Sequence, residues 1–244
     1  LVVIAGIRRP ESSLVLGKRT IIMEYSYINP TMPITIGDGT GIGGHCLLFT
    51  HGSWLSELDG FPVKFSPISI GENVWLPWRV FIMPGVNIGD NVVIGANSLI
   101  NKSFSSNSLI AGSPAKLIKD NFPDKLSADS RTEKLKIIFD DFISYLEFEG
   151  LLVEKIDNKN SFSLNISFKS IFYQLHYISE STQSISQTDL NKNSVVIIDC
   201  EYLDKFANGM QLNLKNKTRT GTNDLGEEIT KFFSRYGIRF DRRD

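Results

Sequence analysis

The chain has 244 residues, of which 41% are hydrophobic and 22% charged, and its formal net charge is −1. This balance is typical of a folded globular protein and excludes a disordered chain, while the small net charge offers no attraction to nucleic acid or to an anionic membrane surface. The longest apolar runs, such as residues 195–198, are too short to span a bilayer. The sequence begins at Leu1 inside a repeat, so we expect an upstream segment in the natural protein.

The strongest pattern in the sequence is a period of six. Branched aliphatic residues recur at this spacing without a break, at Ile70, Leu76, Ile82, Ile88, Ile94 and Ile100. Two positions before each of them lies a second branched or small residue: Ile68, Val74, Val80, Val86, Val92 and Ser98. Upstream, the same step is found at Leu16, Ile22 and Ile28 and then, after a slip of two residues, at Ile36, Ile42 and Leu48.

A period of six matches neither the 3.6-residue period of a helix nor the two-residue alternation of a strand. It is typical of a chain that makes a short strand, turns, and repeats the step on the next face of a triangular prism. The aliphatic side chains then stack inside the prism, where each contributes about 1.5–3 kcal/mol. We therefore predict a mainly β protein with a parallel β-helix over residues 1–122.

The period fails between Leu48 and Ile68, where residues 49–67 read FTHGSWLSELDGFPVKFSP. This segment is polar, mixed and rich in turn-forming residues. Because a solenoid needs no such insertion for its stability, a long loop here favours a functional role. Its candidate functional side chains are His51, Trp54, Glu57 and Asp59.

Four sequence features between Ile34 and Lys119 point to one family. They are the loop that bears His51, the restart PISIGENVWL with Trp75 after its turn, the run MPGVNIGDNVVIGANSLINKS, and the ending IAGSPAKLIK. In combination they resemble the hexapeptide-repeat acyltransferases, particularly the sugar O-acetyltransferase and xenobiotic acetyltransferase branch. The resemblance implies that the β-helix is left-handed and that the chain is a CoA-dependent acyltransferase.

The resemblance also implies how such a site works. In that family, trimers bind acyl-CoA in grooves between neighbouring prisms, and a loop histidine acts as the general base. The matching position here is His51, since an imidazole can take a proton from an attacking hydroxyl or amine near neutral pH. By the same resemblance, the expected residues for binding acetyl-CoA are Gly95, Ala96, Ser98, Asn101, Lys102 and Lys116. No metal is expected.

Other residues are weaker candidates. His45 could be an auxiliary base and Asp59 could orient His51, while Trp54 could stack on a sugar acceptor. After Trp75 the chain departs from the family pattern and reads Leu76-Pro77-Trp78-Arg79. Some family members take their histidine from the position of Arg79, and arginine cannot act as a base at neutral pH. This places the catalytic role on His51 and makes Trp78 and Arg79 candidates for shaping the acceptor pocket.

The second half of the chain reads as an α+β accessory domain over residues 128–244, with no family resemblance. Apolar residues at helical spacing predict a helix over residues 131–149: Leu135, Ile138, Phe139, Phe142, Ile143 and Leu146. We predict strands over residues 151–156, 162–168, 171–178 and 195–198, a helix beginning at Asp224, and a last strand over residues 238–240. His176 and the arginines near the end of the chain are interpreted as structural or surface residues.

The leading functional hypothesis is transfer of an acetyl or short acyl group to a sugar hydroxyl or amine, with a surface-polysaccharide precursor as the acceptor. An alternative is a non-catalytic β-helix scaffold that binds a partner. A carbonic-anhydrase-like β-helix needs three histidine ligands, and only His45 and His51 fall in the repeat. Cys46 and Cys200 have no disulfide or zinc spacing. We expect a cytoplasmic homotrimer without a membrane span that does not bind nucleic acid.

Overall fold

The structure is a computed structural model that describes residues 1–158, 161–178, 190–199 and 208–242. Cys200 lies outside the described residues, so its environment has no structural account. The chain divides into two compact units, Leu1–Lys125 and Leu126–Asp244. Each unit has a hydrophobic core of its own.

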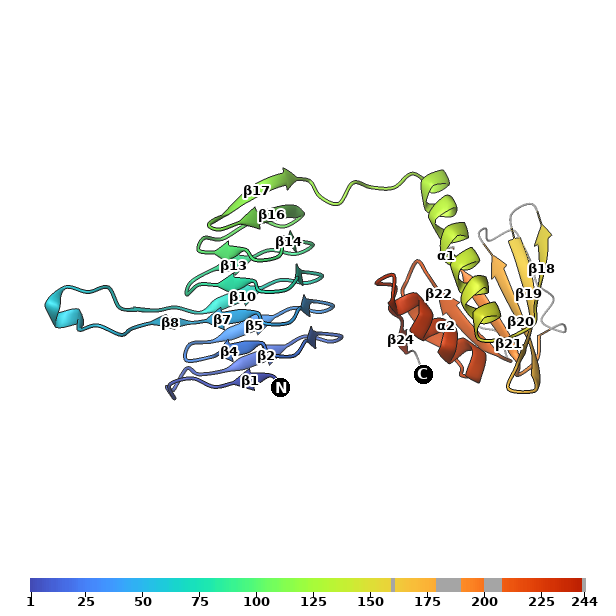
Figure 1. Ribbon diagram of the computed structural model, residues 1–244, viewed down its shortest axis with the longest axis horizontal. Coiled ribbons are helices and arrows are strands. Elements are labelled where there is room, and N and C mark those ends of the chain that lie inside the picture. Colours follow the sequence, from blue (N-terminus) through green and yellow to red (C-terminus); the bar gives the residue numbers. More distant parts are fainter. Residues whose placement is uncertain (159–160, 179–189, 200–207, 243–244) are drawn as a thin grey trace. The chain divides into compact units, whose positions relative to one another are not determined.

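The first unit is a prism of stacked coils whose strands form three sheets, which we call faces 1, 2 and 3 (Figure 1). Face 1 contains β1 (Val3–Ile4), β4 (Tyr27–Asn29), β7 (Leu47–Phe49), β12 (Phe81–Ile82) and β15 (Leu99–Ile100). Face 2 contains β2 (Leu14–Leu16), β5 (Ile34–Ile36), β10 (Ile68–Ile70) and β13 (Asn87–Ile88). Face 3 contains β3 (Ile21–Ile22), β6 (Gly41–Ile42), β11 (Trp75–Leu76), β14 (Val93–Ile94), β16 (Ser108–Gly112) and β17 (Ala115–Asp120).

Neighbouring strands in these faces are parallel, except that β17 turns back antiparallel on β16. The chain visits face 2, then face 3, then face 1, and repeats the circuit, so each face receives a strand from successive coils. The predicted β-helix is confirmed.

The period of six predicted the core of the prism. The continuous ladder from Ile70 to Ile100 is buried, with side chains no more than 2% exposed. The second ladder two positions earlier, from Ile68 to Ser98, is buried to the same extent. Leu16 differs, with 45% of its surface exposed, because β2 is the edge strand of face 2 within the described structure.

Two corners of the prism matter for the site, and they flank face 1. The Trp78 corner joins face 3 to face 1 and comprises residues 23–26, 43–46, 77–80 and 95–98. The loop corner joins face 1 to face 2 and comprises residues 5–13, 30–33, 50–67 and 83–86, continuing at 101–103.

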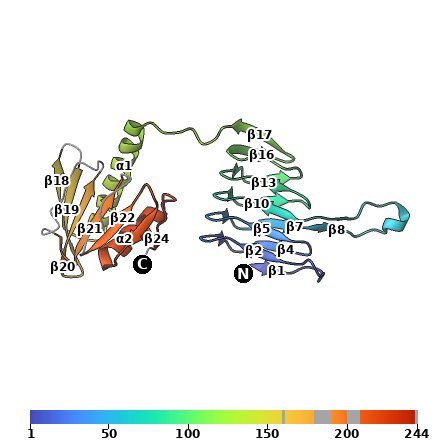
Figure 2. The ribbon, with the colours of Figure 1, turned by 180° about the vertical axis from the view of Figure 1, so that it is seen from behind.

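A long loop leaves the prism at the loop corner, and Figures 1 and 2 show it projecting well beyond the stacked coils. Its base is a short antiparallel pair, β8 (His51–Gly52) and β9 (Lys64–Phe65). Its far end carries a 3-10 turn, η1 (Glu57–Asp59), which Gly60 closes in a left-handed conformation.

The second unit is a mixed sheet with two helices. In spatial order the strands are β18 (Val153–Asn158), β19 (Ser161–Phe168), β20 (Ile171–Ile178), β21 (Ser194–Ile198), β22 (Met210–Asn213), β23 (Thr218–Thr220) and β24 (Asp241–Arg242). Helices α1 (Ala128–Phe148) and α2 (Asp224–Ser234) share a core with residues of β18 to β22. Neither helix is long and apolar enough to cross a bilayer, within the residues described.

The predicted elements of this unit were largely right. Helix α1 buries four of the predicted apolar positions, Leu135, Phe139, Phe142 and Leu146. The predicted strand over residues 238–240 was wrong: Ile238 and Phe240 pack their side chains on the core, and it is Asp241 whose backbone bonds to Lys217 in the sheet. Strands β22 and β23 were missed because their sequences, MQLN and TRT, are short and mostly polar.

Candidate active site at the loop neck

The neck of the loop is fixed to the prism by Thr50. The Thr50 hydroxyl donates to the backbone oxygen of Asn29 at 2.7 Å and accepts from the backbone N–H of Met32 at 2.9 Å. The backbone oxygen of Thr50 accepts from the N–H of Ser66 at 2.9 Å. Both ends of the loop are therefore anchored at one point, where polar groups buried in the prism are satisfied.

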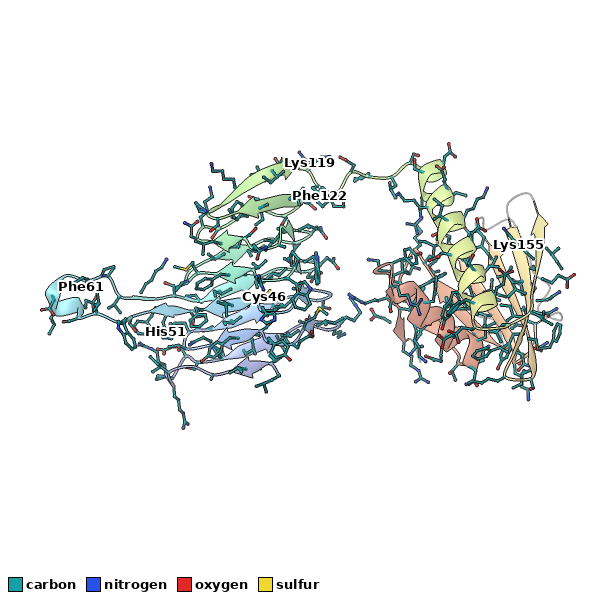
Figure 3. The ribbon with its side chains drawn as sticks, in the orientation of Figure 1. Cys46, His51, Phe61, Lys119, Phe122 and Lys155 are labelled. Atoms are coloured by element: carbon teal, nitrogen blue, oxygen red, sulfur yellow. The ribbon has the colours of Figure 1, made fainter. Side chains whose placement is uncertain are left out.

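His51 lies at this neck, one residue beyond Thr50 (Figure 3). Its ring stacks on Phe65, with centroids 5.7 Å apart and planes at 10°, and it lies 6.4 Å from the ring of Phe49. Its Nδ1 is buried and has no hydrogen-bond partner within the described part of the chain. The imidazole nitrogen that remains open to a substrate is therefore Nε2.

The acidic loop residues do not reach this ring. Glu57 and Asp59 form η1 at the far end of the loop, next to Phe61, whereas His51 is at its base (Figure 3). The expected contact between Asp59 and His51 is absent from the described structure. Trp54 also lies on the projecting part of the loop and is 95% exposed, so it walls no pocket in the single chain.

His45, Trp78 and Arg79 lie together at the Trp78 corner, on the other edge of face 1. His45 stacks on Tyr25 with a centroid distance of 5.0 Å and lies 5.7 Å from Trp78. His45 and Arg79 both have positive φ, as the tight corner requires. His45 and His51 lie at opposite corners of face 1 with β7 between them, and no contact between the two rings is found among the residues described.

The predicted cofactor residues lie at the same two corners and, for Lys116, on face 3. Gly95 and Ala96 are at the Trp78 corner, and Lys116 on β17 is directly opposite Ala111 of β16. Ser98 is 1% exposed, and its hydroxyl donates to the backbone oxygen of Gly95 and accepts from the N–H of Gly112. Its side chain points into the prism because it belongs to the second inward ladder, and its role as a small residue beside pantetheine stays a prediction.

Asn101 and Lys102 are exposed at the loop corner, on the same edge of face 1 as His51. The Lys102 ammonium lies 5.5 Å from the centre of the Phe104 ring. Between the two corners, the outward surface of face 1 is apolar and carries Val3, Tyr27, Leu47, Phe49, Phe81 and Leu99. The candidate residues thus frame one apolar face rather than a closed pocket.

Cys46 is buried in the prism (Figure 3), where burial raises the pKa of its thiol and its Sγ lies 3.0 Å from the backbone oxygen of Pro77. It is inert packing rather than a nucleophile. No cluster of three or more histidine, cysteine, aspartate or glutamate side chains that could hold a metal ion is found among the residues described.

Sequence reasoning missed the aromatic surroundings of His51. Phe49 and Phe65 flank the loop and carry no motif, and only the antiparallel pairing of β8 with β9 brings Phe65 opposite His51. Phe49 could have been found, because it follows the inward Leu48 and must point out of face 1. Arg9, whose guanidinium lies 4.8 Å from the centre of the Phe65 ring, gave no signal in the sequence.

The fold and the repeats define the class of this protein. Residues 67–102 match the family described as bacterial transferase hexapeptide (six repeats), so the first unit is a hexapeptide-repeat left-handed β-helix.

The chain is similar to the putative colanic acid biosynthesis acetyltransferase WcaF of Escherichia coli K12, with 32% identity over 118 residues, 46% of this chain and 64% of the relative. It is 35% identical over 109 residues to the putative lipopolysaccharide biosynthesis O-acetyl transferase WbbJ of the same organism, 40% of this chain and 56% of the relative. The chain therefore spans less than two thirds of the length of these relatives.

Among solved structures, the hexapeptide-repeat acetyltransferase VCA0836 of Vibrio cholerae, in complex with acetyl coenzyme A, is 27% identical. The overlap covers 49% of this chain and 66% of that chain, with a TM-score of 0.43.

Proposed function

We propose that the first unit transfers an acetyl or other short acyl group from acyl-CoA to a hydroxyl or amine of a sugar, with a surface-polysaccharide precursor as the acceptor. The observation that carries the proposal is a histidine held at the neck of the loop with Nε2 open, in a hexapeptide β-helix. The relatives named as acetyltransferases of colanic acid and lipopolysaccharide biosynthesis support the reaction class and the acceptor class.

The chemistry assigned to His51 is general base catalysis. Nε2 takes the proton of the acceptor hydroxyl or amine as that atom attacks the thioester carbonyl, and the proton then passes to the departing thiolate. The carbon–sulfur bond breaks as the new ester or amide bond forms, so no oxidant or metal is required. A positioned base of this kind contributes about 10²–10⁴-fold to the rate.

The residues framing face 1 fit an acyl-CoA molecule. Gly95 and Ala96 give the last coil of the Trp78 corner, residues 95–98, small side chains only, which suits the approach of the narrow pantetheine arm to the backbone. Lys102 and Lys116 are both exposed, and lysine ammonium groups suit phosphates as point charges. Trp78 and Arg79, with His45 beside them, lie at the opposite edge from His51 and would act on the acceptor or on a neighbouring chain.

A homotrimer is part of the proposal, because face 1 is an open surface that needs a second wall to become a groove. The loop supports it: Trp54 and Leu58 are 95% and 99% exposed, and large apolar side chains at that exposure favour contact with another copy. We place the protein in the cytoplasm, where the free thiol of Cys46 would stay reduced.

The test begins with calorimetric titration of acetyl-CoA into the full chain, with desulfo-CoA and the His51→Ala variant in parallel. Saturable binding that the alanine variant retains is the expected result. Transfer to a panel of methyl hexosides and methyl aminohexosides is then followed by release of the CoA thiol. His51→Ala should lower kcat about 10²–10⁴-fold, and His45→Ala, at the opposite edge of face 1, should lower it by a smaller factor.

A well-folded chain that gives no binding heat at millimolar acetyl-CoA would contradict the enzyme and favour the scaffold alternative. Binding with full activity in His51→Ala would retain the enzyme and exclude His51 as its base.

A further inference from the structure

We propose that Phe65 is a positioning residue for His51 and that Arg9, from the first coil, holds Phe65 in place. The inference rests on the proposed role of His51 as the base. It adds a segment of the chain, residues 9–12, that lies far in sequence from the loop and outside every motif identified in the repeat.

The contact between Phe65 and His51 is set by the backbone. The two residues are directly opposite each other where β8 pairs with β9, so their side chains share one side of the two-stranded ribbon. The planes of the two rings are nearly parallel, at 10°, and their centroids are 5.7 Å apart, which is the geometry of an offset stack. A flat ring at this position restricts rotation of the imidazole about its Cβ–Cγ bond.

Within the part of the chain that the structure describes, no hydrogen bond orients the His51 ring. General bases of this type are usually aligned by a hydrogen bond to the second ring nitrogen. Here Nδ1 is buried without a partner, within the residues the structure describes. Stacking on Phe65, with Phe49 at 6.4 Å on the prism side, is therefore what fixes the direction of Nε2.

Arg9 covers the Phe65 ring from the first coil. Its guanidinium carbon lies 4.8 Å from the ring centre, within the range of a cation–π contact. Its nearest carboxylate is Glu11, at 3.7 Å from Nε, and both side chains are about half exposed, with relative areas of 41% and 50%. Because this exposed ion pair is screened by solvent and contributes little, the contact with the Phe65 ring remains the second partner that positions the guanidinium.

Hydrogen bonds hold the backbone that presents Arg9. The N–H of Arg9 donates to the Ser12 hydroxyl at 2.8 Å, and that hydroxyl donates to the backbone oxygen of Thr31 at 2.9 Å. The N–H of Ile7 donates to the Thr31 hydroxyl at 2.9 Å, and the Thr31 hydroxyl in turn donates to the side-chain oxygen of Asn29 at 2.7 Å.

This chain of hydrogen bonds ends at the loop neck. The backbone oxygen of Asn29 accepts a hydrogen bond from the Thr50 hydroxyl. The backbone oxygen of Thr50 accepts one from the N–H of Ser66, the residue after Phe65. Three successive coils are thus linked at the loop corner. Arg9, Phe65 and His51 are all held by the same frame, and movement of the projecting loop tip need not disturb the base.

The experiment compares two substitutions at Phe65 in the full chain. Phe65→Leu keeps an apolar side chain but removes the flat ring, and Phe65→Tyr keeps the ring. With acetyl-CoA and the methyl hexoside that supports transfer, we expect Phe65→Leu to lower kcat about 10–100-fold and Phe65→Tyr to stay near wild type. The KM for acetyl-CoA should be unchanged in both.

Arg9→Gln should lower kcat by a smaller factor than Phe65→Leu does. Arg9→Lys should partly restore kcat, because it keeps a cation over the Phe65 ring.

A second readout does not depend on activity. The chain has three histidines, so ¹⁵N-histidine labelling gives few imidazole signals, and His51→Ala assigns those of His51. We expect one set of His51 ring signals in the wild type and in Phe65→Tyr, and shifted or exchange-broadened signals in Phe65→Leu. Thermal unfolding of each variant checks that the prism is intact.

The outcomes separate the two proposals. Equal kcat and equal His51 signals in Phe65→Leu and Phe65→Tyr would overturn the positioning role while leaving His51 as the base. Full activity in His51→Ala would overturn both. Altered His51 signals in Phe65→Leu support the positioning role even before an acceptor is found.

Discussion

The indole of Trp78 lies directly over Gly44 of the preceding coil. A Cβ added at Gly44 would come within 2.5 Å of the indole, and one at Gly41 would come within 2.7 Å of the ring of Trp75. Both pairs are 34 residues apart, which is one coil plus the inserted loop. The bulky Trp78 in the segment Leu76-Pro77-Trp78-Arg79, where the chain departs from the family pattern, therefore fits because the residue below it in the preceding coil is glycine.

We predict that Gly44→Ala destabilises the first unit by about 1–3 kcal/mol, because the new methyl group overlaps the indole and Trp78 must leave its position. Trp78→Ala should remove most of this cost when the two substitutions are combined. Thermal unfolding followed by tryptophan fluorescence measures it, since all three tryptophans of the chain are in this unit. The combined variant gives the coupling energy between the two positions.

Gly52→Ala is the matched control, because nothing lies within 4 Å of a Cβ at Gly52. Its free energy of unfolding should stay close to that of the wild type. Equal losses at Gly44 and Gly52 would show that the cost at Gly44 does not come from the space that the Trp78 indole occupies.

The fold of the first unit could be predicted from the sequence because each coil repeats one local pattern. The aliphatic of every hexapeptide points inward, so the burial of residues such as Ile82 and Ile94 follows from spacing alone. The second unit was harder, because its sheet joins strands far apart in the chain. Pairing of β20 with β21 and of β23 with β24 depends on tertiary contacts that no local pattern encodes.

The site could be predicted only in part. The interruption of the repeat indicated the loop and its histidine, since a break in a strict period is visible in one sequence. The position of Asp59 relative to His51 depends on how the loop extends, which the sequence does not show. The burial of the Ser98 side chain could be predicted, because Ser98 occupies an inward position of the second ladder. Arg9 approaches the loop neck through stacking of coils, which is invisible without the register between them.

Lys102→Ala should raise the KM for acetyl-CoA by about three- to tenfold, a loss of up to about 1.4 kcal/mol of binding, if its ammonium contacts a CoA phosphate. The effect should shrink as ionic strength rises, because an exposed charge is screened by salt. Dephospho-CoA distinguishes the phosphates: loss of the mutant effect with this ligand assigns Lys102 to the 3′-phosphate. Lys116→Ala is tested in the same way, and Lys125→Ala, on an exposed residue beyond β17, is the control.

The second unit should lose stability as the pH falls below the usual range for a glutamate carboxyl. The hydrogen bond from Arg219, 2.7 Å from Glu227, lowers the pKa of Glu227 against the opposing effect of burial, and a hydrogen bond from Thr222 acts in the same direction. A carboxyl whose pKa is lower in the folded state stabilises the fold above its unfolded pKa. That stability is lost as the pH falls through the folded pKa.

Because Glu227 is 40% exposed, the contribution is small, about 0.2–1 kcal/mol. Urea unfolding followed by helical circular dichroism reports on this unit, since both α1 and α2 belong to it. The wild type should lose more stability than Glu227→Gln between about pH 6 and pH 3. Parallel curves for the two proteins would show that Glu227 contributes nothing to the pH dependence.

The exposed loop tip gives a direct test of the assembly. Leu58 is 99% exposed in the single chain, and a side chain of this size contributes about 1.5–3 kcal/mol when it is removed from water. If a neighbouring copy covers the tip, Leu58→Asp places a charge in an apolar contact and should shift the mass measured by light scattering from three chains toward one. Acetyl transfer should fall with it, because the second wall of the groove is lost.

Glu57→Gln, next to Leu58 and also exposed in η1, is the control and should leave the mass unchanged. Acrylamide quenching of Trp54 supplies a second reading of the same contact. In a trimer that covers the tip, Trp54 is protected, and Leu58→Asp exposes it to the quencher. A wild-type monomer with freely quenched Trp54 would mean that face 1 has no second wall, and the active-site proposal would then require all its contacts from a single chain.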